Sequence, residues 1–339
     1  MRYPEFLKEN GTIAYVAPSF PVFDQPYTDL YDSAKAKFEA LGYQIKEGEN
    51  IHQMLKVASA SDRERAAEFM KAYLDDEVDF IHSVAGGEVM LGMLPYLDFH
   101  ALIHARAKWF MGFSDNTNLT FLLNTVCDVA SLYGSNVGSF GMEKWYRSLR
   151  EAYEIMIGKR LHQKSYRKFA VNDKSHEDGK HLCGYDLTEK STICTSTNED
   201  MTLKGRLVGG CLDVLTPLVG TPYDQVAEFS ERYAKDGILF YLEACDLSPV
   251  GVYRALFQLR EAGWFDNCSG ILFGREHCRE PFFGYTFADA VHDALDSTGI
   301  PFVYEMDFGH VPPSWTIISG ALATVKVREQ KAEISYKLK

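Results

Sequence analysis

The sequence predicts an α/β protein whose N-terminal third is a doubly wound, parallel-sheet domain and whose C-terminal part is a second, α+β domain. Before residue 142, short apolar runs alternate with segments of helical periodicity, which is the pattern of a parallel sheet covered by helices. From residue 205 on, glycine and β-forming residues dominate, and a stretch rich in Lys, His, Asp and Ser lies between the two parts. We therefore expect domains over 1–160 and 205–339, joined by a connecting segment over 161–204.

Each element of the N-terminal domain has its own signal. Residues 12–17 form an apolar run that ends at Pro18, which predicts a central strand. Apolar residues at helical spacing predict a helix over 27–42, and a capping box of Ser61 and Glu64 predicts the start of the next helix. The other expected elements are strands at 79–84 and 108–113 and helices at 88–96, 116–127 and 144–158.

The C-terminal domain shows shorter, more β-like runs. Residues 205–210, 238–242 and 270–273 predict strands, and 250–262 predicts a helix. Two further β-forming runs within 316–338 are consistent with a hairpin that ends the chain.

Composition argues against several classes of protein. Of the 339 residues, 46% are hydrophobic and 24% are charged, as in a globular protein with a sizeable core. The formal net charge of −12 argues against nucleic-acid binding, which needs a basic surface. No apolar run approaches the roughly 18 residues of a membrane-spanning helix, so we expect no membrane span.

The cysteines and histidines predict neither a disulfide framework nor a metal site. The seven cysteines are scattered and include no C-x-x-C pair, which indicates reduced thiols in the cytoplasm. The first residues, Met1-Arg2-Tyr3, begin no apolar signal core, in agreement with that compartment. None of the ten histidines stands in a zinc-ligand spacing, so we expect no metal and no cofactor.

Three polar residues that each follow a strand-like run could form a catalytic triad. They are Ser114 after Gly112-Phe113, Glu243 after the run 238–242, and His310 after Phe308-Gly309. In an α/β fold, the ends of strands present side chains to a cleft. A serine, a carboxylate and a histidine suit the roles of nucleophile, orienting acid and general base.

Members of this set also have ordinary interpretations. Ser114 or Asp115 could cap the helix that follows. The G-x-S-x-G elbow of the α/β-hydrolases, a weaker alternative class, is absent because Asn116 stands where the second glycine would be. Glu243 could be a solvated loop acid, and Asp246 is a rival for its role.

Gly86 and Gly87 follow the strand expected at 79–84. A glycine pair at this position could let backbone N–H groups approach a substrate carbonyl closely, although an ordinary β–α turn would look the same. Cys245, two residues after Glu243, could be a reactive thiol or a buried structural one.

Taken jointly, these segments resemble the LD-carboxypeptidase family of serine peptidases, whose relatives include the microcin C immunity peptidases. The resemblance runs nearly end to end. It is carried by 13–19 (Ile-Ala-Tyr-Val-Ala-Pro-Ser), 84–87 (Val-Ala-Gly-Gly), 108–117, 209–212 (Gly-Gly-Cys-Leu), 220–223 (Gly-Thr-Pro-Tyr), 242–243 and 308–310.

The resemblance implies a fold and a mechanism. The N-terminal domain would be flavodoxin-like or Rossmann-like and the C-terminal domain β-rich and swivelling, in a cytoplasmic homodimer. Ser114 would attack an amide carbonyl, His310 would pass the proton to the leaving amine, and Glu243 would orient His310. Backbone N–H groups of Gly87 and Asp115 would form the oxyanion hole. The family's reaction removes a terminal D-alanine from a muropeptide tetrapeptide.

Two departures from the family pattern favour its microcin-immunity branch. Glu88 follows the glycine pair where the recycling enzymes often carry an aromatic residue, and the connection over 142–205 is long. That branch hydrolyses the amide between an aminoacyl group and a nucleotide-like moiety, and a tryptophan of the connection stacks on the base. Here Trp145 is followed by no tryptophan before Trp264. A stacking platform would have to come from Tyr166, Phe169 or Tyr185.

Two residues are candidates for substrate binding. Gly86 belongs to the turn beside the expected oxyanion hole, and Arg275, after Phe273-Gly274, could read a terminal carboxylate with its guanidinium. A structural ion pair is the alternative for Arg275. A non-enzymatic, two-lobed ligand-binding protein is the alternative for the whole chain, and the presence of all three triad residues argues against it.

Overall fold

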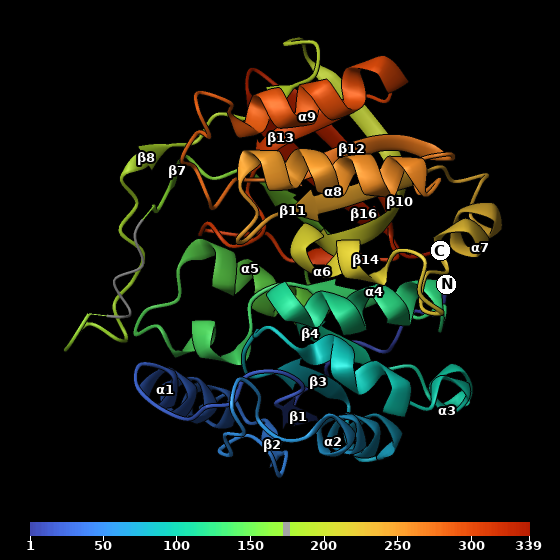
Figure 1. The fold of residues 1–339 in the computed structure, drawn as a ribbon. Helices are drawn as coiled ribbons and strands as arrows, with labels where there is room; N and C mark the ends of the chain where they lie inside the picture. Colours follow the sequence, from blue (N-terminus) through green and yellow to red (C-terminus); the bar gives the residue numbers. More distant parts are fainter. Residues whose placement is uncertain (172–176) are drawn as a thin grey trace.

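A computed structural model describes residues 1–171 and 177–339; residues 172–176 of the connecting segment lie outside the described residues (Figure 1). Within the described chain, one sheet has six strands in the order β14-β5-β4-β3-β1-β2. All neighbours pair in parallel except β14, which runs antiparallel to β5. The order 2-1-3-4-5 of the parallel strands is that of flavodoxin-like sheets. The strands are β1 (Thr12–Val16), β2 (Gln44–Glu47), β3 (Phe80–Ser83), β4 (Trp109–Gly112), β5 (Ser131–Tyr133) and β14 (Ile317–Ser319).

Both faces of this sheet are covered by helices, because its strands alternate apolar side chains between them. In β1, Ile13 and Tyr15 pack in the same hydrophobic cluster as α1 (Tyr27–Ala40) and α5 (Arg147–Met156). Ala14 and Val16 pack in the other cluster, with α2 and α4. The helices on that side are α2 (Asp62–Leu74), α3 (Phe99–His104) and α4 (Thr117–Thr125).

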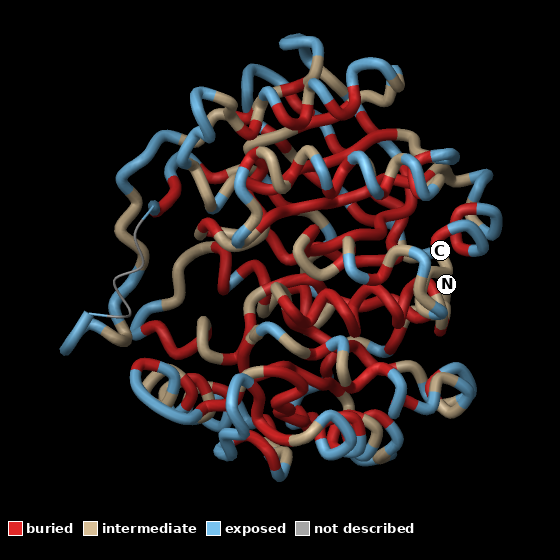
Figure 2. The backbone as a smooth tube through the Cα atoms, in the orientation of Figure 1, coloured by how far each residue is buried: buried red, intermediate tan, exposed pale blue. Residues whose placement is uncertain are grey.

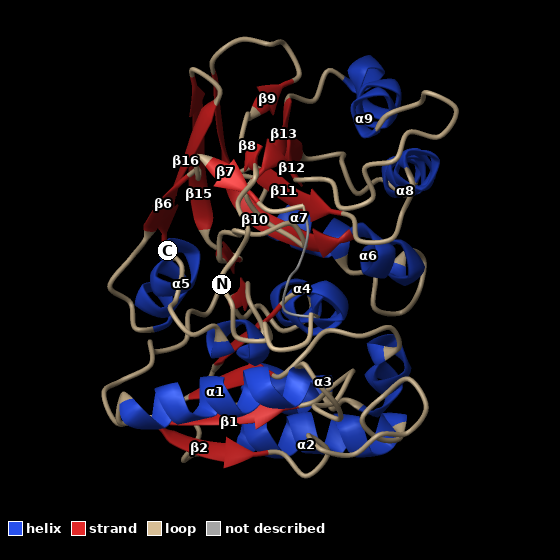
Figure 3. Ribbon diagram, turned by 90° about the vertical axis from the view of Figure 1, so that its left-hand side faces the viewer, coloured by secondary structure: helices blue, strands red, loops and turns tan. Residues whose placement is uncertain are grey.

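The second sheet has eight strands in the described chain, in the order β6-β16-β15-β10-β11-β12-β13-β9. Its centre, β10 to β13, is parallel, and antiparallel strands extend it on both sides. Figure 3 shows α6, α8 and α9 against one face of this sheet. The strands are β6 (His162–Lys164), β9 (Cys194–Thr195), β10 (Met201–Cys211), β11 (Ile238–Glu243), β12 (Cys268–Gly274), β13 (Phe302–Met306), β15 (Leu322–Arg328) and β16 (Lys331–Lys337). The helices are α6 (Leu212–Leu218), α7 (Val226–Arg232), α8 (Pro249–Glu261) and α9 (Phe287–Leu295).

The fold class expected from the sequence is confirmed: a parallel-sheet N-terminal region is followed by a β-rich C-terminal region. The capping box of Ser61 and Glu64 is also confirmed at the start of α2. Short elements complete the chain: β7 (Lys168–Phe169) and β8 (Glu189–Lys190) pair with each other, and 3₁₀ turns lie at η1 (Met90–Tyr96), η2 (Ser114–Asn116), η3 (Val137–Gly141) and η5 (Asp296–Thr298).

One local expectation was wrong. The helix expected at 88–96 is the 3₁₀ helix η1, which contains Pro95, a residue that cannot donate the backbone hydrogen bond of an α-helix. The hairpin expected within 316–338 is confirmed, since β15 and β16 pair antiparallel there. Gly320, at φ 87°, turns the chain between β14, in the first sheet, and β15, in the second.

The interior is continuous from one sheet to the other. One hydrophobic cluster contains Ile13 of β1 together with Leu239 of β11, and the other contains Val16 together with Phe240. Figure 2 shows buried backbone running through the middle of the molecule, with exposed segments on its rim. Among the helices of the described ranges, none has the length and apolar character that crossing a bilayer requires.

Candidate active site

A cavity of about 750 Å³ lies where strands of both sheets end. Loops after β1, β3, β4 and β5 line one side, and loops after β11, β12 and β13 line the other. In open parallel sheets, this is the position at which ligands bind. Its described lining includes Gly86, Gly87, Ser114 and His310, so four of the residues expected from the sequence meet here.

Ser114 occupies a strained turn between β4 and α4. Its φ is 65°, a left-handed conformation that is unfavourable for a residue with a side chain. The serine of a nucleophile elbow sits in such a strand-to-helix turn. In the described chain no side-chain hydrogen bond caps η2 or α4, so capping does not account for the serine. Gly86 makes room for it, because a Cβ at Gly86 would lie 2.9 Å from Ser114 Cβ.

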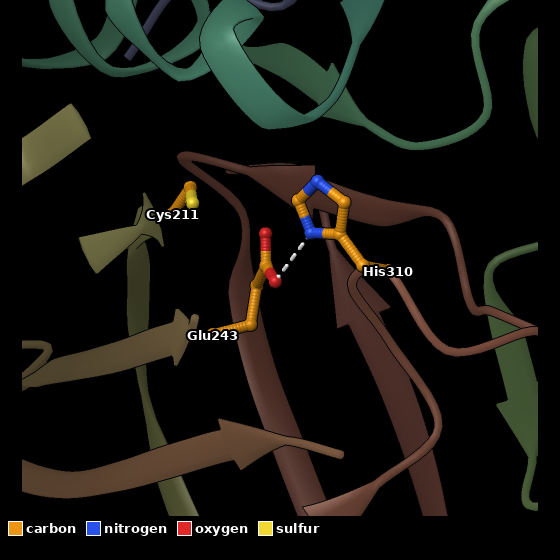
Figure 4. Close-up of side chains that lie close together, drawn as sticks. All are labelled: Cys211, Glu243 and His310. Carbon is orange, nitrogen blue, oxygen red and sulfur yellow. Dashed lines mark hydrogen bonds and ion pairs between the residues drawn. The ribbon is translucent and has the colours of Figure 1, made fainter. Parts of the chain in front are cut away.

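Glu243 and His310 form a hydrogen-bonded pair. His310 Nδ1 lies 2.8 Å from Glu243 Oε2, and the other ring nitrogen points away from the carboxylate (Figure 4). Glu243 is the last residue of β11 and is fully buried. Gly309 permits the approach: its φ is 94°, and a Cβ there would lie 2.8 Å from Glu243 Oε2. Asp246, the rival acid, is exposed and lies outside this pair.

The two members of the pair shift each other's ionisation. Burial by itself raises the pKa of the Glu243 carboxyl, but the charge and hydrogen bond of His310, with hydrogen bonds from Tyr133 and Cys211, hold that pKa below its usual range. Burial by itself lowers the pKa of His310, but the Glu243 charge and the neighbouring Cys245 raise it well above its ordinary value. The site therefore favours an imidazolium beside a carboxylate, which is the state a general base reaches after it accepts a proton.

Ser114 and His310 share the cavity, and the ring centroid of Phe113, the residue before Ser114, lies 5.0 Å from that of His310. Among the described residues, no hydrogen bond joins the Ser114 hydroxyl to the imidazole. Catalytic hydrogen bonds are often long in an enzyme without substrate and tighten when the substrate binds.

The turns expected to form the oxyanion hole are tied together by Asp115. Its buried carboxylate accepts hydrogen bonds from the Ser19 hydroxyl, from Met90 N–H at 2.8 Å and from Asn118 Nδ2 at 3.0 Å. Gly87 lies at φ 143° against the same serine, where a Cβ would come within 2.1 Å of Ser19 Oγ. The loop after β3 is thus fixed against the turn that carries Ser114.

Two residues near the triad were missed by sequence reasoning. The Tyr133 hydroxyl donates a hydrogen bond to Glu243 Oε1 over 2.5 Å, and no local pattern marks a tyrosine at the end of a three-residue strand. Cys211, which ends β10, lies beside Glu243 and His310 (Figure 4).

Cys211, Glu243 and His310 each offer an atom that could bind a metal, and these atoms lie within 4.8 Å of one another. Burial raises the pKa of the Cys211 thiol well above its usual value, and the charges of Glu243 and Asp213 raise it further. Metals bind the thiolate rather than the thiol. We therefore interpret Cys211 as a neutral hydrogen-bonding neighbour of the triad.

Arg275 lies in the interior rather than among the described lining residues of the cavity. Its guanidinium is fully buried, pairs with Asp307 over 2.9 Å and sits 4.2 Å above the Phe169 ring. These contacts are those of a structural ion pair, so we leave Arg275 out of the proposed substrate site. Of the three possible stacking residues, Tyr166 and Phe169 are buried, and Tyr185 lines the cavity.

Other polar groups share the cavity wall with Ser114 and His310. Glu88 also lines the cavity and is largely exposed, and partial burial of its carboxyl, together with the charges of nearby acids, raises its pKa. Cys245 and His277 lie next to His310: His277 Nδ1 is 3.1 Å from the Cys245 carbonyl oxygen, and its ring centroid is 5.9 Å from that of His310.

Comparisons with known proteins identify the family of the chain. The LD-carboxypeptidase N-terminal domain family matches residues 13–134, and the LD-carboxypeptidase C-terminal domain family matches residues 204–325. The chain is 26% identical over 335 residues to the probable murein peptide carboxypeptidase of Bacillus subtilis (strain 168), covering 98% of this chain and 93% of that protein. It is 23% identical over 307 residues to the microcin C7 self-immunity protein MccF of Escherichia coli, covering 87% and 84%.

Solved structures share the fold. An MccF-like protein from Bacillus anthracis str. Ames superposes with a TM-score of 0.85 at 21% identity, over 100% of both chains. Microcin C7 self-immunity protein MccF in its apo state gives 0.84 at 20% identity, over 99% of each chain. With the two family matches, the chain is identified as a member of the LD-carboxypeptidase family of serine peptidases.

Proposed function

We propose that this protein is a serine carboxypeptidase that cleaves an L,D-amide bond and releases the terminal D-alanine of a muropeptide tetrapeptide. The observation that carries the proposal is the Glu243–His310 pair in the same cavity as Ser114, the strained residue after β4. The similarity to a probable murein peptide carboxypeptidase over 98% of the chain supports the substrate class.

In the proposed reaction, Ser114 Oγ attacks the amide carbonyl carbon while Nε2 of His310 takes the hydroxyl proton. The carbonyl oxygen becomes an oxyanion, to which the backbone N–H groups of Gly87 and Asp115 donate. The C–N bond then breaks, and His310 gives its proton to the leaving amine. Water, activated by His310, hydrolyses the acyl-enzyme and restores Ser114. Glu243 holds Nδ1–H throughout and stabilises the imidazolium.

A second candidate is an amidase that hydrolyses aminoacyl-nucleotide conjugates with the same triad. Tyr185 in the cavity wall favours it, because an aromatic ring there could stack on a base. MccF structures contain aspartyl sulfamoyl adenosine and glutamyl sulfamoyl guanosine, which are ligands of that type. For either activity, we propose a cytoplasmic homodimer that needs no metal or cofactor.

The test uses purified wild type and Ser114→Ala on two substrates, a tetrapeptide ending in D-alanine and an aminoacyl sulfamoyl-adenosine. Release of D-alanine by wild type alone supports the carboxypeptidase, and cleavage of the conjugate alone supports the amidase. We expect Ser114→Ala to lose roughly 10⁴-fold or more in kcat, because the triad acts as a unit. Cleavage of neither substrate, or equal activity of the variant, would contradict the proposal.

A further inference from the structure

Tyr133 stands where the two halves of the candidate site meet. It ends β5 in the first sheet, and its backbone pairs with Ile317 of β14, seven positions after His310. The side chain is almost wholly buried, yet it borders the cavity that contains Ser114 and His310. Tyr133 thus contacts both the strand that follows His310 and the cavity that contains Ser114.

The Tyr133 hydroxyl makes two hydrogen bonds of opposite sense. It donates to Glu243 Oε1 over 2.5 Å and accepts from the backbone N–H of Ser114 over 3.3 Å. The remaining oxygen of Glu243 accepts from His310 Nδ1. A chain of hydrogen bonds therefore runs from the Ser114 backbone through Tyr133 and Glu243 to His310.

We propose that Tyr133 is a positioning residue of the triad: its hydroxyl fixes the Glu243 carboxylate relative to the Ser114 turn, and thereby sets the direction of the His310 imidazole. This inference rests on the proposed function of the triad. It follows from the burial of Glu243, because a buried carboxylate needs hydrogen bonds to both oxygens. Tyr133 donates to Oε1, the oxygen that His310 does not bond, and Cys211 is a further, weaker thiol donor to the carboxylate.

The tyrosine keeps this donor role at any working pH. Burial and the charge of Glu243 raise the pKa of the Tyr133 hydroxyl well above its ordinary value, so the phenol stays protonated. The other titratable groups around the pair are Cys211 beside Glu243, and Cys245, His277 and Glu88 beside His310. A substitution of Tyr133 leaves all four in place.

The test compares Tyr133→Phe with a matched control, Tyr241→Phe. Tyr241 is also fully buried, its ring centroid lies 5.4 Å from that of Tyr133, and its hydroxyl donates to Ser319 Oγ over 2.9 Å, outside the triad. Each variant removes one buried hydroxyl and keeps the ring. Thermal melting checks the fold, and the titration of His310 is followed by NMR with ¹⁵N-labelled histidine, assigned with His310→Gln.

In Tyr133→Phe we expect His310 to titrate at higher pH than in wild type, because the negative charge of a carboxylate that has lost a donor is less offset and stabilises the imidazolium more strongly. We also expect kcat on the cleaved substrate to fall roughly 10- to 100-fold with little change in KM, since the base is misdirected. Tyr241→Phe should change neither quantity.

Unchanged titration of His310 in Tyr133→Phe would overturn the inference, as would the same shift in both variants. Failure of Tyr133→Phe alone to fold would also overturn it, because the hydroxyl would then serve the fold rather than the triad. If wild type cleaves neither substrate, the proposed function fails, but the NMR titration still decides whether Tyr133 acts on the Glu243–His310 pair.

Discussion

At the scale of single residues, the charge of His310, the proposed general base, should set the pH range in which the enzyme is active. A general base must be neutral to accept a proton, and Glu243 raises the pKa of His310 well above its ordinary value. Activity should therefore be lost as the pH falls through this raised pKa. In Glu243→Gln the carboxylate charge is gone, burial then dominates, and the acidic limb of kcat/KM should move to lower pH. We expect kcat to drop roughly 10⁴-fold as well, since the amide can hold the wrong tautomer. If the acidic limb of the pH–rate profile of Glu243→Gln stays at its wild-type position, this prediction is wrong.

Ser114, Glu243 and His310 could be singled out from the sequence because each follows an apolar run that ends near a cleft. Tyr133 could not, because its role exists only when β5 meets the end of β11, a contact between residues 110 positions apart. Arg275 illustrates the opposite case. Its position after a strand and a glycine is suitable for binding a substrate carboxylate. The burial of its side chain against Asp307 and Phe169, however, depends on packing that no local sequence pattern indicates.

At the scale of elements, β3 contains a buried histidine that should make the fold sensitive to acid. His82 Nε2 lies 2.9 Å from the Ser135 carbonyl oxygen, and Nδ1 has no hydrogen-bond partner among the described residues. Burial lowers the pKa of His82 to about 4. The unfolded chain, with an ordinary histidine pKa, takes up the proton first as the pH falls, so this one group should remove up to about 3 kcal/mol of stability between roughly pH 6.5 and pH 4.

The measurement is urea unfolding of wild type and His82→Gln at pH 7.5 and pH 5. Glutamine can still donate to the Ser135 carbonyl oxygen, but it does not titrate. The variant should be less stable than wild type at pH 7.5, and this deficit should shrink at pH 5, because protonation in the unfolded state destabilises wild type only. His100→Gln, at an exposed position, is the control and should follow wild type at both pH values. A deficit that is the same at both pH values would mean that His82 does not titrate as its burial suggests.

Elements with strong local signals were predictable, and those defined by long-range pairing were not. The Ser61–Glu64 capping box fixes the start of α2 within a few residues, so sequence alone suffices. β14 is a three-residue strand whose place depends on β5, nearly two hundred positions earlier in the chain. Its apolar run was correctly read as β-forming, but the sheet it joins depends on the whole fold.

At the scale of the whole molecule, the two sheets share their cores and one strand of the C-terminal part completes the first sheet. The division of the chain into 1–160, 161–204 and 205–339 was drawn from the sequence alone. Because the two sheets share their cores, we expect the fragment 1–160 not to fold by itself. Without β14, the outer edge of β5 is unpaired, and apolar surface that meets the second sheet becomes exposed to water. Circular dichroism and limited proteolysis of the fragment beside the full chain test this. A protease-resistant fragment with a cooperative melt would contradict it.

The left-handed turn at Ser114 has a consequence for any effort to improve this protein. A residue with a side chain in that conformation stores on the order of 1–3 kcal/mol, a noticeable share of the roughly 5–15 kcal/mol by which a typical domain is stable. Glycine would relieve most of that strain. A screen that rewards thermal stability alone would thus favour replacement of the side chain that we propose as the nucleophile, and selection for heat resistance would have to be coupled to a measure of turnover.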